Sequence, residues 1–264
     1  MENLARRIDE DRIEPECLGI YWLAQAGFAF KTSAGKIVYI DPYLSDLVER
    51  VAGFKRMMPC PITAEEVVAD LVVCTHEHPD HLDTDALPII ARNPRPHFAG
   101  PLECVKEFKK LGIPEHRCHL LEVGKEITVA AIRMVGVYAD HGEFAPDALG
   151  VVLDLEGVKV YHTGDTAYRP EGFRAAIDMR PEVLIPCING RFGNLNPLEA
   201  AQLVREARPQ LAIASHFWMF VEHNGDPAAF LEGCANLAPG IKAVVVKPGE
   251  EWLFRKNLRV CDNF

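Results

Sequence analysis

Short apolar runs separated by turn residues predict strands in the first part of the chain. The runs are LGIYWL (18–23), GFAFKT (27–32) and KIVYI (36–40), and the turn sequence SAG lies at 33–35. Closely spaced runs of this kind are typical of antiparallel strands joined by hairpins. Asp41-Pro42 ends the third strand. We expect 43–69 to be irregular apart from a short capped helix at 63–66.

Strands and helices alternate over much of the remaining chain. The pattern predicts strands at 71–74 and 97–99, helices from about 83 and over 101–111, and a return to strands over 117–138. Later strands lead into two helices that open at Asn196-Pro197 and Asp226-Pro227, and the chain closes in strands. We therefore expect an α/β fold, a four-layer αββα sandwich, as a single domain over residues 1–264.

Composition narrows the class of protein and of partner. The chain has 264 residues, 48% of them hydrophobic and 25% charged, with a net charge of −10. An acidic chain without a clustered basic surface argues against nucleic acid or an anionic membrane as a partner. The eight cysteines form no CxxC, and no secretory signal or membrane span is visible. We expect a cytoplasmic enzyme with a small-molecule substrate; a homo-oligomer remains open.

Residues 75–83, THEHPDHLD, hold three of the ten histidines directly after an apolar strand. In an extended backbone His76 and His78 project to the same side, because side chains alternate with a period of two. Pro79 then favours a turn, after which Asp80 and His81 face a second point. Imidazoles with a carboxylate match the ligands of zinc, or of manganese with more oxygen donors. The alternative, a polar surface turn, suits a single histidine better than this crowded pattern.

Ligand-capable residues also follow other predicted strands. They are Asp41, His141, Asp165 and His216. Each one alone has a structural explanation, since Asp-Pro and Gly-Asp-Thr are common turn sequences. Together they repeat one arrangement, a polar side chain on a loop that leaves an apolar strand, and this repetition favours a metal site.

The order of these residues resembles the five motifs of the metallo-β-lactamase-fold hydrolases. The resemblance spans most of the chain and implies two divalent metal ions, Zn²⁺ or Mn²⁺. It implies that His76, His78 and His141 hold one ion and that Asp80, His81 and His216 hold the other. It further implies that Asp165 bridges the two ions and that Asp41 is a buried carboxylate that fixes the ligand loop by hydrogen bonds.

A narrower resemblance concerns the substrate. The segment ADHGE at 139–143 differs from the GHTxGH-like loop of glyoxalase II and the β-lactamases. GIYWLAQAGFAF, VYADHGE, YHTGDT, PCINGRFGNLNPLEAA and ASHF with the later HNGDP look more like the L-ascorbate-6-phosphate lactonase (UlaG-like) group. That resemblance implies a hydrolase of a small, phosphorylated lactone or ester.

The expected chemistry assigns roles to individual residues. A bound metal lowers the pKa of its water to about 7, and the resulting hydroxide would attack beside Asp165. Asp80 is the candidate for moving the proton, and both aspartates count as catalytic. His162 is expected behind the metal ligands. We expect four polar side chains to contact the substrate. They are Asn189, Arg191, His223 and Asn224.

Two other functions remain open at this level. The same metal pair can activate attack at phosphorus, which would make the protein a phosphodiesterase for a small substrate or a phospholipid head group. A non-catalytic, metal-binding regulatory domain is the other alternative.

Overall fold

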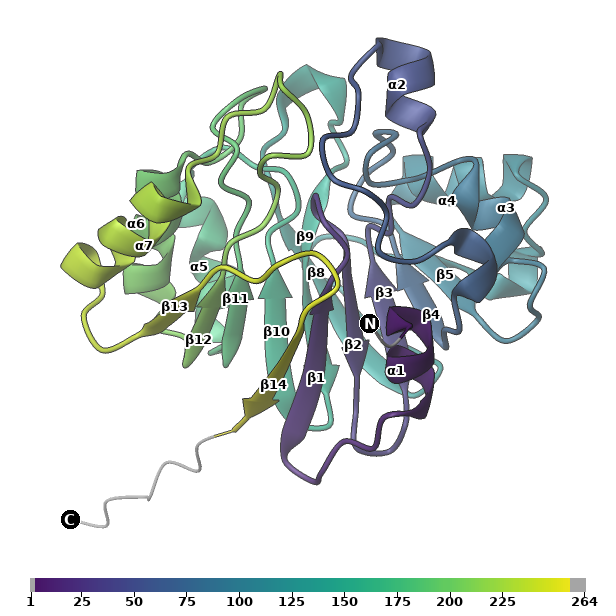
Figure 1. Cartoon of the computed structure of the whole chain (residues 1–264), viewed down its shortest axis with the longest axis horizontal. Coiled ribbons are helices and arrows are strands. Elements are labelled where there is room, and N and C mark those ends of the chain that lie inside the picture. Colours follow the sequence, from purple (N-terminus) through teal and green to yellow (C-terminus); the bar gives the residue numbers. More distant parts are fainter. Residues whose placement is uncertain (1–2, 257–264) are drawn as a thin grey trace.

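Two seven-stranded sheets face each other in the computed structural model, which describes residues 3–256 (Figure 1). The first sheet has the order β14-β1-β2-β3-β4-β5-β6, with bounds β14 (Glu251–Arg255), β1 (Cys17–Trp22), β2 (Phe28–Lys31), β3 (Ile37–Ile40), β4 (Leu71–Val73), β5 (His97–Gly100) and β6 (Cys118–Leu120). The second has the order β13-β12-β11-β10-β9-β8-β7, with bounds β13 (Lys242–Val244), β12 (Leu211–Ile213), β11 (Val183–Ile185), β10 (Val158–His162), β9 (Leu149–Leu155), β8 (Ile132–Tyr138) and β7 (Glu126–Val129).

Both sheets combine antiparallel and parallel pairs. β14, β1, β2 and β3 pair antiparallel, whereas β3, β4, β5 and β6 pair parallel. In the second sheet β7 to β10 pair antiparallel and β10 to β13 pair parallel. Parallel strands carry their carboxyl ends to one edge, so the loops after β4, β11 and β12 leave their sheets in positions where they can build a common site.

Helices cover the outer faces of both sheets (Figure 1). Beside the first sheet lie α1 (Leu4–Glu10), α3 (Ala86–Ile90) and α4 (Leu102–Lys110), with the 3₁₀ turns η1 (Ala64–Glu66) and η2 (Glu115–Arg117). Beside the second lie α5 (Pro170–Asp178), α6 (Pro197–Ala207) and α7 (Pro227–Leu237), and η3 (Gly142–Phe144) follows β8. No helix within residues 3–256 is long and apolar enough to cross a membrane.

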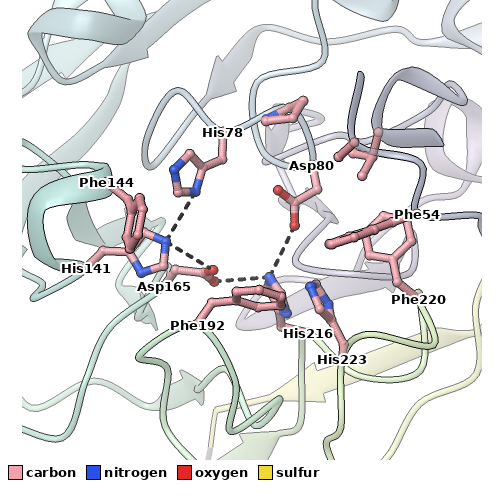
Figure 2. Close-up of a pocket in the computed structure, with 13 residues that line it drawn as sticks. Phe54, His78, Asp80, His141, Phe144, Asp165, Phe192, His216, Phe220 and His223 are labelled. Atoms are coloured by element: carbon pink, nitrogen blue, oxygen red, sulfur yellow. Dashed lines mark hydrogen bonds and ion pairs between the residues drawn. The ribbon is translucent and has the colours of Figure 1, made fainter. Parts of the chain in front are cut away.

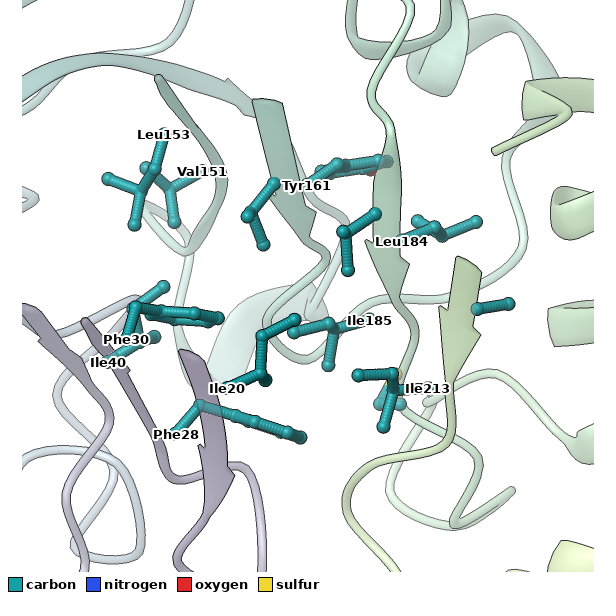
Figure 3. Packing of buried hydrophobic residues seen from close by; sticks show 14 of the residues in the cluster. Ile20, Phe28, Phe30, Ile40, Val151, Leu153, Tyr161, Leu184, Ile185 and Ile213 are labelled. Carbon is teal, nitrogen blue, oxygen red and sulfur yellow. The ribbon is translucent and has the colours of Figure 1, made fainter. Parts of the chain in front are cut away.

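The main core lies between the two sheets. Ile20, Phe28 and Phe30 of the first sheet and Val151 and Ile185 of the second belong to one buried cluster (Figure 3). The alternate residues of the same strands face outward, and in the first sheet these include side chains that pack against the helices. Strands buried on both faces explain why the apolar runs in the sequence are continuous rather than alternating.

The expected four-layer αββα sandwich is confirmed, and so are the hairpin strands and the capped helices at Asn196 and Asp226. The expectation of irregular structure over 43–69 was wrong in one place. α2 (Leu47–Ala52) is a helix that stands at the top of Figure 1, apart from the other helices. It ends at Gly53, whose φ of 76° is left-handed. A helix of six residues is too short to produce a recognisable helical period in the sequence.

Asp70, directly before β4, bonds through its backbone to Ile37 of β3 and to His97 of β5. Its carboxylate accepts hydrogen bonds from the backbone N–H of Ile37 at 2.9 Å and from Arg95 Nη2 at 2.7 Å. Burial disfavours the charged carboxylate, but these donors outweigh that cost and lower the pKa of Asp70 below its ordinary value. The ionised group therefore stabilises the fold above the pH at which it titrates in the unfolded chain, and this contribution is lost as the pH falls.

We predict that Asp70→Asn lowers the free energy of unfolding at pH 7 by about 2 kcal/mol, because the neutral amide keeps only one acceptor oxygen and loses the ion pair with Arg95. For a chain of this size the thermal midpoint should fall by roughly 4–8 °C. Differential scanning calorimetry of both proteins, with a chelator present to remove metal, would measure the two midpoints. The difference between the midpoints should shrink below about pH 4. Glu115→Gln, which breaks the exposed pair with Lys109, is the matched control and should change the midpoint little. Equal midpoints for the parent protein and Asp70→Asn would contradict this role.

Candidate metal centre

The loop after β4 makes one sharp turn between two groups of polar side chains. Cys74 and Thr75 continue the strand direction, and the backbone N–H groups of His81 and Leu82 both donate to the carbonyl of His78, at 2.9 and 2.8 Å. The chain therefore coils directly after Pro79, as the sequence predicted. His76 and His81 are completely buried, with ring centroids 4.0 Å apart. The loop thus delivers ligand-capable atoms to two neighbouring points.

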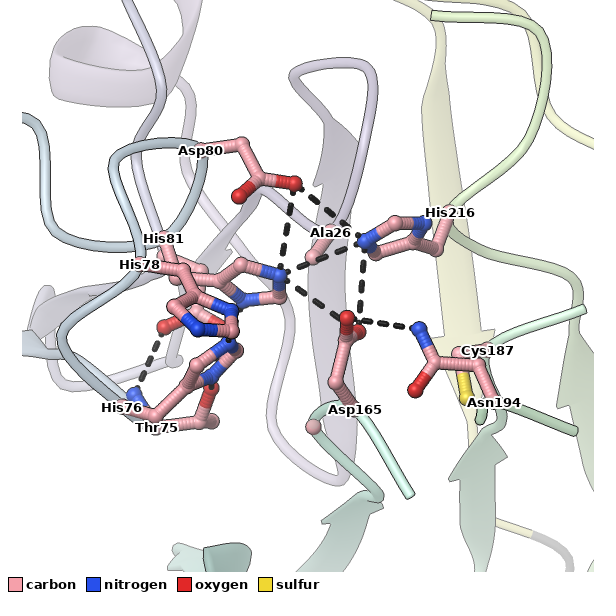
Figure 4. Close-up of polar contacts among 12 residues, drawn as sticks. Ala26, Thr75, His76, His78, Asp80, His81, Asp165, Cys187, Asn194 and His216 are labelled. Atoms are coloured by element: carbon pink, nitrogen blue, oxygen red, sulfur yellow. Dashed lines mark hydrogen bonds and ion pairs between the residues drawn. The ribbon is translucent and has the colours of Figure 1, made fainter. Parts of the chain in front are cut away.

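Three histidines form the first group. His76 Nε2 lies 3.0 Å from His78 Nδ1, and His141 Nε2 lies 3.2 Å from the same atom (Figures 2 and 4). Each neutral imidazole has one nitrogen that donates a hydrogen bond and one that accepts. A single proton on one of these three converging nitrogens cannot give the other two a good hydrogen bond at the same time. Three nitrogen lone pairs within reach of one point are the donor set that a transition metal takes. The residues present therefore fit a metal ion.

Asp80, His81 and His216 form the second group (Figure 4). His81 Nε2 lies 3.3 Å from His216 Nε2, and Asp80 Oδ2 lies 3.6 and 3.4 Å from these two nitrogens. All three side chains turn their potential ligand atoms toward one another, and a carboxylate with two imidazoles suits zinc or manganese.

Asp165 lies between the two groups. Its Oδ1 is 3.2 Å from His216 Nε2 and 3.4 Å from His81 Nε2, while its Oδ2 is 3.8 Å from His141 Nε2 (Figure 2). One oxygen therefore faces each group. Asn194 Nδ2 donates a 2.6 Å hydrogen bond to Oδ2 and fixes the orientation of the carboxylate (Figure 4).

The electrostatics of the two groups differ. Burial lowers the pKa of His76 well below its ordinary value, and burial likewise lowers that of His141, so both rings are neutral and keep a free lone pair. For His216 burial opposes the charge, but Asp165 and Asp80 outweigh it and raise the pKa to about 9. In the second group protons thus supply the positive charge that the buried carboxylates need. A metal ion would take over that role and release the protons.

Asp41 anchors the ligand loop from below. It follows β3, is completely buried, and accepts from the Thr75 backbone N–H at 2.8 Å and from the Thr75 hydroxyl at 2.7 Å. The N–H bond goes to Oδ1 and the hydroxyl bond to Oδ2, and His81 Nδ1 also lies 2.8 Å from Oδ2. A carboxylate on one imidazole nitrogen directs the remaining nitrogen outward and raises its basicity. Asp41 is therefore placed to hold His81 in the orientation that the second group requires.

Three residues around the site adopt a left-handed backbone that side chains other than glycine rarely accept. They are Gln25, Asp41 and His216, with φ of 51°, 47° and 58°. The backbone N–H of His216 donates to the carbonyl of Gln25 at 2.9 Å, which ties the loop after β12 to the turn after β1. Unusual backbone of this kind persists where surrounding contacts fix it, and it concentrates at functional sites.

Sequence reasoning missed Gln25 and Asn194. Gln25 Nε2 donates to Asp80 Oδ2 at 2.7 Å and lies 3.2 Å from His216 Nε2. Both residues lie within segments that carry the narrower resemblance, GIYWLAQAGFAF and PCINGRFGNLNPLEAA, but neither was singled out as a site residue. Each is an ordinary loop residue type, Gln25 between β1 and β2 and Asn194 between β11 and an N-cap.

A cavity of about 220 Å³ opens above the two groups (Figure 2). His78, Asp80, His141, Asp165 and His216 form its polar floor. The rest of the lining is His223 and a set of mainly apolar side chains: Val48, Ala52, Phe54, Pro79, Phe144, Phe192 and Phe220. A substrate that enters this cavity therefore reaches the convergent donor atoms directly.

The four residues expected to contact substrate lie in different places. His223 lines the cavity, and its ring stacks on His216 with centroids 4.8 Å apart. Asn189 is buried, whereas Arg191 and Asn224 are exposed, and none of these three lines the cavity. His162, expected behind the metal ligands, is buried at the end of β10. Its Nε2 is 2.9 Å from the carbonyl of Ala26, and its Nδ1 accepts from Gly164 N–H.

Comparison with known proteins agrees with this geometry. Residues 36–217 match the model of the Beta-lactamase superfamily domain. A UPF0173 metal-dependent hydrolase from Cupriavidus taiwanensis is 30% identical over 258 residues, which cover 88% of this chain and 85% of the relative.

Solved structures resemble the fold. A metallo hydrolase from the archaeon Ignicoccus hospitalis, Igni18, superposes with a TM-score of 0.73 at 23% identity, over 91% of this chain and 100% of that one. An isothiocyanate hydrolase from Delia radicum gut bacteria superposes with a TM-score of 0.74 at 18% identity, over 90% and 99% of the two chains. The match over 36–217 and the hydrolase relatives show that the chain belongs to the beta-lactamase superfamily, among its UPF0173 metal-dependent hydrolases.

Proposed function

We propose that this metal-dependent hydrolase binds two divalent ions, Zn²⁺ or Mn²⁺, and cleaves a small carboxylic ester or lactone. The observation that carries the proposal is the position of Asp165, whose two oxygens face two separate groups of three donors. One carboxylate shared between two such groups suits a pair of ions better than a single ion.

The metal pair and the protein contribute different parts of the chemistry. When bound, two such ions lower the pKa of water toward 7 and stabilise negative charge that develops on a substrate oxygen. Asn194 holds Asp165 in place between the two groups. Gln25 donates to Oδ2 of Asp80, the oxygen that faces His81 and His216. We assign Oδ1 of Asp80 to receive the proton of the attacking water and to deliver it to the leaving oxygen.

The cysteines support the cytoplasmic location expected from the sequence. All seven cysteines within residues 3–256 are free thiols, which suits a reducing compartment.

The metal content has a direct test. Elemental analysis of gently purified protein should find about two transition-metal ions per chain, and His76→Ala with His78→Ala should lose both, because the pair supplies two of three donors to one ion and shapes the loop that holds the other. His97→Ala with His119→Ala is the matched control. Those two rings also contact each other, with Nδ1 and Nε2 2.9 Å apart, but they lie on β5 and β6 away from the cavity. No stoichiometric metal in the parent protein would contradict the proposal.

The reaction has a separate test. Metal-loaded protein should hydrolyse members of a panel of aryl esters and lactones faster than bis-p-nitrophenyl phosphate. Asp80→Asn should lower kcat by roughly 10²–10⁴-fold, the usual contribution of a positioned acid–base group. Metal analysis of the variant separates a lost proton carrier from a lost ion. Turnover of the phosphodiester alone would make the protein a phosphodiesterase and would overturn the assignment of ester or lactone.

A further inference from the structure

Aromatic side chains from four separate segments line the cavity. Phe54 follows α2, Phe144 ends η3, Phe192 lies in the loop after β11, and Phe220 lies in the loop after β12 (Figure 2). The ring centroid of Phe54 is 6.2 Å from that of Phe192 and 6.1 Å from that of Phe220. We call these four residues the aromatic wall. Its members come together only in the folded chain.

Two members of the aromatic wall are exposed to an unusual degree. The exposed fraction is 80% for Phe144 and 54% for Phe192. Phe192 also has a left-handed backbone, with φ of 55°, which rarely suits an aromatic residue. Exposed rings around a concave site are typical of a surface that binds an apolar group, because burial of each ring against a ligand removes apolar area from water.

The cavity lining combines phenylalanines and small apolar residues with histidines and aspartates. No lysine or arginine of the described residues lines the cavity. Arg56, close in sequence to Phe54, donates its Nη1 to the carbonyls of Tyr43 and Ser45, and its guanidinium lies 4.4 Å from the Tyr43 ring centroid. An anionic substituent packed against Phe220, the fully buried member of the aromatic wall, would lose hydration with no lysine or arginine of the lining to pair with, which is unfavourable.

We propose that the substrate is an uncharged ester or lactone whose acyl or leaving group is an aryl ring or a short alkyl chain, bound by the aromatic wall. This inference rests on the proposed function for its reactive group, and it replaces the phosphorylated substrate expected from the resemblance. The aromatic wall holds the apolar group while the polar floor receives the ester carbonyl.

The size of the cavity limits the apolar group. A cavity of about 150 Å³ is large enough for benzene. The cavity here measures about 220 Å³, so it holds one ring or a chain of a few methylenes together with the reactive group. A longer group would extend past Phe144 and Phe192 into water and would gain little further.

Binding can be measured without turnover by using ligands that share one metal-chelating head. We would titrate metal-loaded protein calorimetrically with acetohydroxamate, butanohydroxamate, pentanohydroxamate, benzohydroxamate and succinic acid monohydroxamate. Each added methylene should tighten binding about two- to fourfold, as expected for burial of one CH₂. The carboxylate-tailed ligand should bind at least about 30-fold more weakly than pentanohydroxamate. Equal affinity across the series, or no measurable binding of any member, would overturn the inference.

Substitutions of Phe192 test whether the aromatic wall causes the preference for ligands with apolar tails. Phe192→Ser should reduce the ratio of benzohydroxamate to acetohydroxamate affinity by about three- to tenfold, in line with the loss of one aromatic contact. Phe192→Arg should instead strengthen binding of the carboxylate-tailed ligand. Leu253→Ser is the matched control, because Leu253 is similarly exposed, at 53%, but lies on β14 and does not line the cavity. An unchanged ratio in both Phe192 variants would contradict the role of the aromatic wall.

Parallel assays with neutral and carboxylated aryl esters separate this inference from the proposed function. A tail preference in binding without hydrolysis of any ester or lactone would support the apolar site and overturn the proposed function. Hydrolysis of carboxylated and neutral esters at equal kcat/KM would support the proposed function and overturn the apolar substrate class.

Discussion

The rest of this structure depends on one constraint. Imidazole nitrogens and carboxylate oxygens that could ligate a metal are buried together with too little positive charge to compensate them. His76, His81 and His216 are almost fully buried, and Asp165 is buried with them. Such a cluster is costly unless cations compensate it, and protons on His81 and His216 do so only for the second group. Two bound metal ions would satisfy both groups at once, and metal binding would then be coupled to the stability of the loops.

The two sheets hold this cluster from opposite sides. The loop after β4 belongs to the first sheet, while Asp165 and His216 follow strands of the second (Figures 1 and 4). Asp41 anchors the first side, and the hydrogen bond from His216 N–H to the carbonyl of Gln25 ties the second side to it. A rigid core between the sheets therefore sets the distance between the two groups, as a preorganised site requires.

Features written in local sequence could be predicted, and features created by folding could not. The apolar runs and THEHPDHLD are local patterns, set by residues that are neighbours in the chain. The strands, the αββα layers and the turn after Pro79 could therefore be predicted from the sequence. Gln25 and Asn194 reach the site only through loops whose paths no pattern encodes. The aromatic wall is hidden for the same reason, since its phenylalanines are far apart in the chain. Arg191 shows the converse, because a promising Gly-Arg pair lies outside the cavity lining.

Anomalous X-ray scattering from crystals of the metal-loaded protein would show directly whether the two groups of side chains each bind an ion. We expect two peaks roughly 3.5–4 Å apart, the spacing of two-metal hydrolytic sites. One should contact His76 Nε2, His78 Nδ1 and His141 Nε2, the other Asp80, His81 and His216, and Asp165 should lie between them. A single peak, or peaks away from these side chains in protein that carries stoichiometric metal, would contradict the binding of two ions by these side chains.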